Sequence, residues 1–397
     1  MTSRPLIILI LGCWLSAPAR ADEDEAGFVP IFDGKTLDGW KVVGGGAKYR
    51  VEGGEIVGTV DPASKSNTFL RTDRTYGDFI LKLDLKLDVP GNSGIQFRSH
   101  QRTEPNGSVR VFGYQAEVDP LPRAWSGGLY DEGRRGWLYD LRDHPEARKA
   151  FHVQGWNAYV IEARGPRIRI TLNGVPCADY LDTMDLEGFI ALQVHAGKEG
   201  VIRWKDVRVK DLGESRWKPL WDGKTLEGWV AVGGGHFAVE GDAIRGTNAS
   251  SDPKHGHLFS REIYGDFAVK FRFRSDRGNS GLYFRADEGG SLGVRGFQAE
   301  VDPTNDVGGL YETEGRGWVV QPKPEDVKKW FRPGAWNEMS VVALGDRVVV
   351  HVNGTRSAEI VDPRGRKRGK FALQVHGGQD VDVRFKDIEI LVLGEGK

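Results

Sequence analysis

The chain has 397 residues, of which 55 are basic and 56 acidic, so its formal net charge is −1. Charges so evenly mixed argue against nucleic acid or an anionic membrane surface as the partner. The composition includes 54 glycines and 12 tryptophans, which favours strands joined by frequent turns, with aromatic rings available for sugar binding. The length is sufficient for two domains, each with its own core.

Residues 1–21 are predicted to be a secretory signal peptide. The apolar run "LIILILGCWLSA" follows a single positive charge and is too short to span a bilayer. The small residues of "ARA" then form a cleavage site before the acidic "DEDE". One alternative is an uncleaved anchor, which the short run disfavours, and another is a lipoprotein box ending at Cys13, which Leu11 fits poorly. We therefore expect a periplasmic or secreted protein with no membrane partner after signal removal, in which Cys177 has no disulfide partner.

The remaining chain is a tandem repeat. "FDGKTLDGW" at Phe32 returns as "WDGKTLEGW" at Trp221, and "GYQAEVDP" at Gly113 returns as "GFQAEVDP" at Gly296. A period of roughly 180 residues is too long for a solenoid unit. The pattern therefore predicts two copies of one domain, at about residues 26–212 and 215–397, and the short junction predicts that the two domains touch.

Each copy has the pattern of many strands and very little helix. In residues 79–89 apolar and charged side chains alternate, as in a strand with one buried face. Residues 167–174, "RIRITLNG", also alternate and end in an Asn-Gly pair, a strong hairpin signal. Only residues 144–151 and 323–331 predict short helices. These patterns predict an all-β protein in which each copy is a β-sandwich or jelly roll.

The repeated strands carry polar residues on the face opposite the core. In "GYQAEVDP" the side chains of Tyr114, Ala116 and Val118 point to one face, and polar side chains point to the other. The same alternation places polar residues on the second face of "GIQFR" and "ALQVHA". The polar set of the first copy is Arg98, Gln115, Glu117, Asp119, Gln193 and His195, and that of the second is Arg285, Gln298, Glu300, Asp302, Gln374 and His376.

All six residue types recur in the second copy, whereas the charged face of residues 79–89 changes its residues. We therefore expect the polar set to line a groove. The alternative is a buried hydrogen-bond network that fixes the fold, with Glu117 paired to Arg98. A divalent metal bound by His195, Glu117 and Asp119 also stays open, since spacing alone does not fix the geometry.

The loop "GGLYDEGRRGW" adds the residues of a sugar site. Its glycines allow close approach of a ligand to the backbone, Tyr130 and Trp137 offer apolar surfaces with a polar end, and Arg135 offers a fork of donors. The matching residues of the second copy are Tyr311, Trp318 and Arg316. "GNSG", which contains Asn92, is a tight turn or part of the same site. Ser93 has no G-x-S-x-G context that would support a nucleophile.

With "DGKTLDGW", "GNSGIQFR", "GYQAEVD", "GGLYDEGRRGW" and "FIALQVHAGKEGVIRWKDV" in this order, the chain resembles the 3-keto-disaccharide hydrolase family, once in each repeat. The resemblance implies a concanavalin A-like jelly-roll fold in each domain. It also implies cleavage of glycosides whose sugar has been oxidised to a 3-ketone, so that the partner is an oxidised carbohydrate. No cofactor is implied with certainty, and a divalent metal remains open.

A ketone at C3 makes the C2 proton acidic, so the reaction needs a base, an acid and donors for an enolate oxygen. We expect Glu117 to be the base, His195 or Tyr130 the acid, and Arg98 or Arg135 the enolate donor. The sugar would be positioned by Asn92, Gln115, Asp119, Trp137 and Gln193. The first copy, with "PLPRAWSGG" before its loop, is expected to be active, and the second to be weaker or to bind only.

Two other functions stay open on the sequence alone. A non-catalytic tandem carbohydrate-binding protein would use the same polar faces to hold a glycan, with avidity from two sites. An ordinary glycosidase would need two carboxylates flanking C1 and would act on unoxidised sugar. The aglycone, the linkage and the oligomeric state are not specified by the sequence.

Overall fold

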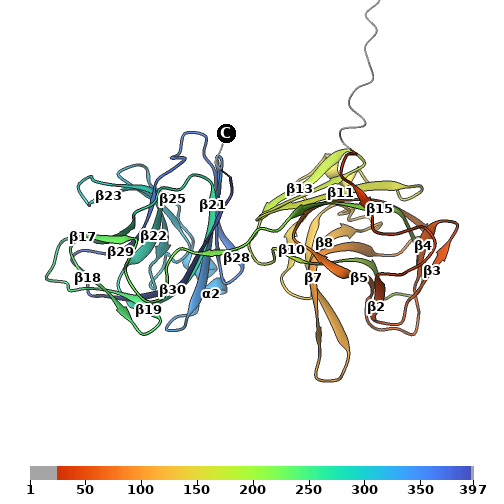
Figure 1. Ribbon diagram of the computed structural model, residues 1–397, viewed down its shortest axis with the longest axis horizontal. Coiled ribbons are helices and arrows are strands. Elements are labelled where there is room, and N and C mark those ends of the chain that lie inside the picture. Colours follow the sequence, from red (N-terminus) through yellow and green to blue (C-terminus); the bar gives the residue numbers. More distant parts are fainter. Residues whose placement is uncertain (1–24, 395–397) are drawn as a thin grey trace, which may run out of the picture.

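A computed structural model describes residues 25–394, which form two β-sandwiches side by side, one from each sequence repeat (Figure 1). The predicted signal peptide lies outside the described residues. Each domain has a back sheet and a front sheet, and the paired strands are antiparallel. The prediction of two all-β sandwich domains in tandem is confirmed. No helix in the described part of the chain is long and apolar enough to cross a bilayer.

The first domain is built from strands β1 to β15 and one short helix, α1 (Pro145–Arg148). In spatial order, its back sheet comprises β13 (Val175–Leu181), β12 (Arg167–Leu172), β11 (Asn157–Arg164), β6 (Asp78–Val89), β15 (Val201–Gly213), β4 (Glu55–Thr59) and β3 (Lys48–Glu52), with β1 (Val29–Pro30) beside β15. Its front sheet comprises β10 (Gly136–Tyr139), β9 (Leu129–Glu132), β8 (Val109–Val118), β7 (Ser93–Thr103), β14 (Gly188–Val194), β5 (Thr68–Tyr76) and β2 (Trp40–Gly44).

The second domain repeats this arrangement with helix α2 (Pro324–Trp330). Its back sheet comprises β18 (His236–Glu240), β19 (Ala243–Asn248), β30 (Val381–Val392), β21 (Phe267–Arg277), β26 (Asn337–Leu344), β27 (Arg347–Val352) and β28 (Thr355–Val361), with β16 (Lys218–Pro219) beside β30. Its front sheet comprises β17 (Trp229–Gly233), β20 (Gly256–Ser260), β29 (Lys370–Val375), β22 (Ser280–Glu288), β23 (Val294–Val301), β24 (Leu310–Thr313) and β25 (Gly317–Val320).

The core of each domain lies between its two sheets and follows the alternation seen in the sequence. Along β6 every second side chain is buried, and the facing strand β8 contributes Tyr114, Ala116 and Val118. Tyr114 and Phe97 of the front sheet stack with ring centroids 5.7 Å apart. The Asn-Gly hairpin between β12 and β13 is also as predicted, because Asn173 and Gly174 both have positive φ.

The front sheet of the first domain curls so far that edge strand β2 returns to contact β8. The enclosed face holds a small apolar cluster of Phe69, Val111, Phe189 and Ala191, with Val43 against it. As a result, the polar side chains of this face are largely buried rather than spread along an open groove. An opening remains at one end of the face, and the candidate site lies there.

The two domains touch, as the short junction predicted, through an apolar row on the back sheet of the second domain. Leu391, Ala268, Val342 and Val349 are cross-strand neighbours in this row, and they form one buried cluster with Leu181 of the first domain. The same row of the first domain is polar, because it consists of Lys210, Ile80, Glu162 and Arg169. The second copy has therefore exchanged charged residues for aliphatic ones where its neighbour docks.

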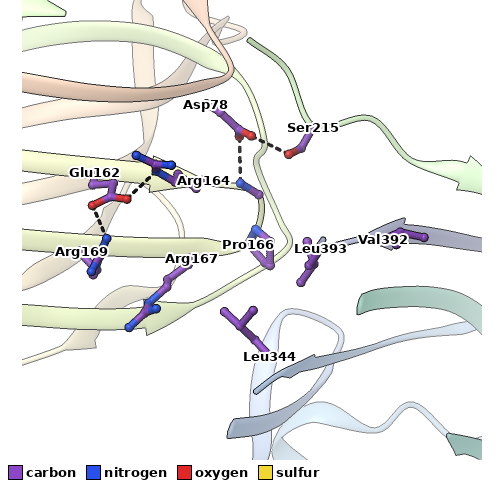
Figure 2. Close-up of a pocket in the computed structure, with 11 residues that line it drawn as sticks. Asp78, Glu162, Arg164, Pro166, Arg167, Arg169, Ser215, Leu344, Val392 and Leu393 are labelled. Atoms are coloured by element: carbon purple, nitrogen blue, oxygen red, sulfur yellow. Dashed lines mark hydrogen bonds and ion pairs between the residues drawn. The ribbon is translucent and has the colours of Figure 1, made fainter. Parts of the chain in front are cut away.

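Hydrogen bonds fix the edge of this junction. Ser215, in the segment that joins the domains, donates to Asp78 at 2.7 Å, and Asp78 also accepts from the backbone N–H of Gly165 at 2.9 Å (Figure 2). Across the junction, Arg347 donates to the carbonyl of Asp179 at 3.0 Å. These contacts hold the two sandwiches in one relative orientation.

Candidate functional site

A pocket of about 390 Å³ opens at one end of the front sheet of the first domain. Polar residues on β8 and β9 line its floor, and the loop between these strands forms part of its wall. Trp137 of β10, the residues just before β5 and β7 and the residue that follows β14 complete the lining. The lining residues are Asn67, Asn92, Gln115, Glu117, Leu121, Arg123, Tyr130, Glu132, Trp137 and His195.

Glu117 is the centre of a buried hydrogen-bond network in this pocket. Its carboxylate accepts from the side-chain amides of Asn92 and Gln115, each at 2.8 Å. The Gln115 oxygen in turn accepts from Gln96 at 2.5 Å, and the Gln96 oxygen accepts from Ser99 at 2.8 Å. In this series each residue donates to the next one toward the Glu117 carboxylate. The network therefore favours the ionised form of Glu117.

Burial acts in the opposite direction on the same carboxylate. Glu117 is 4% exposed, and its desolvation raises its pKa to about 7, although the hydrogen bonds from Asn92 and Gln115 lower it. A carboxyl group with this pKa is present in both protonation states near neutral pH. It can therefore accept a proton from carbon and release it again, which is the property of a general base.

Three further groups in the pocket can exchange a proton. Burial and the nearby Glu132 carboxylate raise the pKa of Tyr130, so its phenol stays a donor at neutral pH. Burial also raises the pKa of Glu132, whose carboxylate accepts from Asn67 at 3.4 Å. His195 hydrogen-bonds through Nδ1 to the carbonyl of Ala196 at 2.8 Å, which leaves Nε2 for a ligand. The structure thus brings together Glu117, Tyr130 and His195, as the sequence predicted.

Arg123 is the only lysine or arginine among the pocket-lining residues. Its Nε donates to Asp119 at 2.7 Å, and that carboxylate is fully buried. The guanidinium lies over the rings of Trp125 and Trp137, 4.8 and 5.0 Å from their centroids. Asp119 was expected to help position a sugar. It does not line the pocket, and instead it anchors Arg123.

The structure contradicts the prediction that Arg98 stabilises an enolate. Its guanidinium is fully buried outside the pocket, where it donates to the carbonyls of Gly77 and Gly165 and pairs with Asp78 at 2.7 Å. The alternation that placed it beside Glu117 fails because Arg98 has φ of +43° and lies where the register of β7 and β8 shifts. The alternative of a Glu117–Arg98 pair is also wrong, although Glu117 does belong to a buried network.

Arg135 was the second candidate for that role, and it too points away from the pocket. It pairs with Asp131 at 2.5 Å and with Asp182 at 2.7 Å, and its Nη1 donates to the carbonyl of Gly354 in the second domain at 3.0 Å. Its role is to tie the β9–β10 hairpin to the domain junction. In the second copy Arg316 makes the equivalent pairs with Glu312 and Asp362.

Of the residues expected to position a sugar, Asn92, Gln115 and Trp137 line the pocket. Gln193 is fully buried behind it, and its amide has no hydrogen-bond partner among residues 25–394. Sequence reasoning missed Asn67, Leu121, Arg123 and Glu132. Arg123 belongs to "PLPRAWSGG", a segment that differs from the shorter "PTNDVGG" of the second copy. This difference was the feature of the sequence that could have pointed to Arg123.

The second domain keeps the carboxylate but changes its surroundings. Glu300 accepts from Asn279 at 3.3 Å, while Gln298 turns to Gln374 at 2.9 Å instead of to the carboxylate. Asp302 accepts from Thr304 and Asn279, and no arginine of residues 25–394 is paired with it. Burial raises the pKa of Glu300 well above its ordinary value, and the charges of Asp302 and Asp306 raise it further.

The interior beside Glu300 has also been rebuilt. His255, His257 and Tyr283 occupy the positions of Asn67, Phe69 and Gln96, and Thr313 occupies that of Glu132. The rings of His255 and His376 are 4.2 Å apart, and Tyr283 hydrogen-bonds Thr313 at 2.8 Å. Tyr311 and Trp318 keep the edge-to-face contact of Tyr130 and Trp137. Arg285 is held by Asp266 just as Arg98 is held by Asp78.

No group of three or more histidine, cysteine, aspartate or glutamate residues in the described chain is arranged to hold a metal ion. The metal site considered for His195, Glu117 and Asp119 therefore finds no support in the geometry. Asp119 is engaged with Arg123 and does not line the pocket, whereas Glu117 and His195 do.

A second cavity, of about 360 Å³, lies at the domain junction (Figure 2). Three arginines line it, but each has a carboxylate partner. Glu162 pairs with Arg164 at 2.6 Å and also with Arg169, and Asp179 pairs with Arg167 at 2.6 Å. With its charges matched inside the protein, this cavity has the character of a gap between two docked surfaces.

A search of curated proteins gave no match. Among solved structures, a candidate glycosyl hydrolase from Parabacteroides distasonis ATCC 8503 is 20% identical, and the match covers 45% of this chain and 94% of that one at a TM-score of 0.35. A carbohydrate-binding module from Bacillus subtilis is 20% identical, over 41% and 95% of the two chains, at a TM-score of 0.33. A Bacillus subtilis protein with a galectin-like fold is 15% identical, over 45% and 94%, at 0.36. TM-scores this low carry no argument about function.

The comparison with family models is decisive. The model of the 3-keto-alpha-glucoside-1,2-lyase-like domain matches the chain twice, at residues 27–210 and 216–391. Together the two matches cover nearly all of the part that forms the sandwiches. The chain therefore belongs to the family of 3-keto-alpha-glucoside-1,2-lyase-like domains, of which it contains two in tandem.

Proposed function

We propose that the protein cleaves the glycosidic bond of 3-keto-glycosides, with the first domain as the catalytic one. The observation that carries this proposal is the buried carboxyl group of Glu117. Its pKa lies near neutrality, and it stands in a pocket with a phenol, an imidazole and a second carboxyl group. This inventory suits the removal of a proton from carbon, for which the base must be neither fully protonated nor too weak at neutral pH.

In the proposed reaction, Glu117 takes the proton from C2, and the electron pair of the C2–H bond forms a C2–C3 double bond while the carbonyl pair moves onto the C3 oxygen. When the C3 carbonyl re-forms, a C1–C2 double bond develops and the C1–O bond to the aglycone breaks. Tyr130 or His195 protonates the departing oxygen, and Glu132 is a third candidate for this role. Addition of water to the C1–C2 double bond completes a net hydrolysis.

Several features favour the first domain over the second. The pocket-lining residues Asn67, Arg123 and Glu132 have no equivalent of the same type in the second copy. Glu300 has lost one of the two amide donors that assist ionisation, and its pKa lies well above its ordinary value. Burial that raises the pKa of Glu300 disfavours its ionised form, which is the form a base needs. We therefore assign the second domain a role in holding the carbohydrate.

The location of the protein is part of the same proposal. The leader predicted at residues 1–21 would carry the chain out of the cytoplasm, so we place the reaction in the periplasm or outside the cell. A non-catalytic tandem binding protein is the competing function, and it is favoured by the burial that disfavours the ionised form of Glu300 in the second domain.

The test is an incubation of the mature protein with a 3-keto-disaccharide and with its unoxidised parent, each with and without EDTA. Sugar release is followed by chromatography, and exchange of the C2 hydrogen for deuterium in D₂O is followed by NMR. Release and exchange with the ketone alone support the proposal, and both should disappear in Glu117→Gln but persist in Glu300→Gln. Binding of either sugar without release or exchange would favour the binding protein, and release from the unoxidised parent would favour an ordinary glycosidase.

A further inference from the structure

The pocket offers one cation to a ligand, and the sequence did not single it out. Arg123 follows the end of β8 and is tethered by its Nε to Asp119, whose carboxylate also accepts from the backbone N–H of Leu121 at 3.2 Å. Because the tether uses Nε, the two terminal nitrogens remain, and no hydrogen bond from them to another described residue is found. A guanidinium held in this way presents a fixed pair of donors.

The two tryptophans beside Arg123 restrict its orientation, while its side chain stays 43% exposed at the mouth of the pocket. Trp125 and Trp137 are 4.8 Å apart and perpendicular to each other, and the guanidinium lies within 5.0 Å of both ring centroids. Trp137 also contacts Tyr130 edge to face at 5.1 Å. The arginine therefore lies against the aromatic side chains of the pocket and lines it together with Glu117 and Tyr130, with its terminal nitrogens open to a ligand.

The electrostatic effect of this residue reaches the base. Burial is the main cause of the raised pKa of Glu117, and the positive charge of Arg123 opposes it. In the second domain the loop from Asp302 to β24 is shorter and brings Asp306 instead, whose negative charge adds to the raised pKa of Glu300. The two loops thus present charges of opposite sign to Glu117 and Glu300, which occupy equivalent positions in the two copies.

We propose that Arg123 stabilises the negative charge that develops on the C3 oxygen when Glu117 removes the C2 proton, and that the 121–126 loop thereby confines the reaction to the first domain. This inference rests on the proposed function. It gives the pocket the enolate donor that neither Arg98 nor Arg135 supplies. Removal of the proton from C2 leaves one negative charge, delocalised over C2 and the C3 oxygen, and a bidentate guanidinium is a suitable partner for it.

The experiment compares three full-length variants with the wild type in C2 hydrogen–deuterium exchange on a 3-keto-disaccharide. Arg123→Gln removes the charge, and Arg123→Lys keeps the charge without the fork. Arg142→Gln is the matched control, because Arg142 lies on Trp125 at 5.8 Å but does not line the pocket. We expect Arg123→Gln to lower kcat for exchange by about 10²–10³-fold with a small change in KM, Arg123→Lys to fall between, and Arg142→Gln to match the wild type.

A second readout separates charge stabilisation from a structural role. Without Arg123 the acid limb of the kcat/KM profile should move to higher pH, since the charge that favours ionised Glu117 is gone, whereas Arg123→Lys should keep the limb near its wild-type position. Exchange by Arg123→Gln within about twofold of wild type, or a change in KM alone, would overturn the inference while the Glu117→Gln result still supports the proposed function. Failure of the wild type to exchange would overturn both.

Discussion

The carboxyl group of Glu117 must be ionised before it can accept a proton from C2. Because burial raises its pKa to about 7, kcat/KM on a 3-keto-disaccharide should rise with pH and level off above about 7. Initial rates measured between about pH 5 and pH 9 in buffers of constant ionic strength would give this profile. A profile without a rise in this range would show that another group is the base.

The same raised pKa makes the stability of the protein depend on pH. Between the ordinary glutamate pKa of 4.5 and about 7, folded Glu117 binds a proton that the unfolded chain releases, so the free energy of unfolding falls as pH rises through this window. The full loss is about 3 kcal/mol at pH 8 relative to pH 4. Glu117→Gln has no titrating group at this position. Its melting temperature should therefore rise relative to that of the wild type as pH increases.

Thermal melts of the wild type and Glu117→Gln at several pH values would test this expectation. The quantity to compare is the difference in melting temperature between the two proteins at high pH, minus the same difference at low pH. This subtraction removes any constant effect of the substitution on packing. Parallel melting curves across the whole range would contradict a raised pKa for Glu117. A gain in stability together with a loss of turnover would fit the trade-off common at active sites.

The polar residues that the sequence grouped together include the proposed base and two candidate acids, since Glu117, Tyr130 and His195 share one pocket. Arg98 and Arg135 were predicted to stabilise the enolate because both residues recur in the second copy, and neither lines the pocket. Arg98 and Arg135 recur for structural reasons, as Arg285 and Arg316 show. Arg123 occurs once, so a search for repeated residues passes over it.

At the level of the front sheet, Gly94 makes room for the network around Glu117. It lies on β7 directly between Glu117 of β8 and Gln193 of β14, and a methyl group there would meet Cγ of Gln115 at 2.5 Å. Gly94→Ala should displace Gln115 from Glu117 and lower turnover by about tenfold or more, since a carboxylate loses one donor. Gly197→Ala, where the methyl group meets only ordinary contacts, is the control.

Turnover and melting temperature measured together would interpret this pair. A large fall in kcat with a fall of only a few degrees in melting temperature would show that Gln115 acts through Glu117. Equal activity in Gly94→Ala and Gly197→Ala would show that the network is not needed for catalysis. The strands themselves were predictable from alternation, but the curl that buries Gln96 and Gln193 was not, because it depends on contact between β2 and β8.

The strand β7 shows where period-two reasoning ends. Ile95 and Phe97 lie in the core and Gln96 on the opposite face, as predicted. The positive φ of Arg98 then rotates the chain, and its side chain enters the space between Gly77 and Gly165. Arg285 does the same in the second copy. An irregularity of this kind is set by tertiary contacts and leaves no mark in the hydrophobic pattern.

For the whole molecule, the junction between the domains depends on aliphatic side chains that replaced charged ones. Val342 is fully buried at the junction, at the position that Glu162 holds in the first domain. Val342→Glu should weaken docking by about 2 kcal/mol or more, because a carboxylate would be buried without a partner. The radius of gyration from solution scattering should increase, and protease should cut the segment at residues 213–217 faster.

Glu162→Val makes the reverse exchange at the equivalent position of the first domain, where the carboxylate lines the junction cavity and pairs with Arg164 and Arg169, and it serves as the comparison for that experiment. Unchanged scattering and proteolysis in Val342→Glu would mean that the polar contacts alone hold the domains. The exchange of Glu162 and Arg169 for Val342 and Val349 is visible once the repeats are aligned. The short junction predicted only that the domains touch, since nothing in one sequence says which surfaces meet.

A contact between two different faces is not closed by symmetry. When each unit presents both faces, repeated contacts of this kind can form a filament. Here the first domain provides a protruding side chain, Leu181 (the knob), and the second provides the aliphatic row of Leu391, Ala268, Val342 and Val349 (the socket). The counterpart of the knob in the second domain, Val361, is 70% exposed, but the socket of the first domain is closed by Lys210, Glu162 and Arg169. The duplication therefore limits this mode of docking to two domains, and separate molecules are not expected to associate end to end through it.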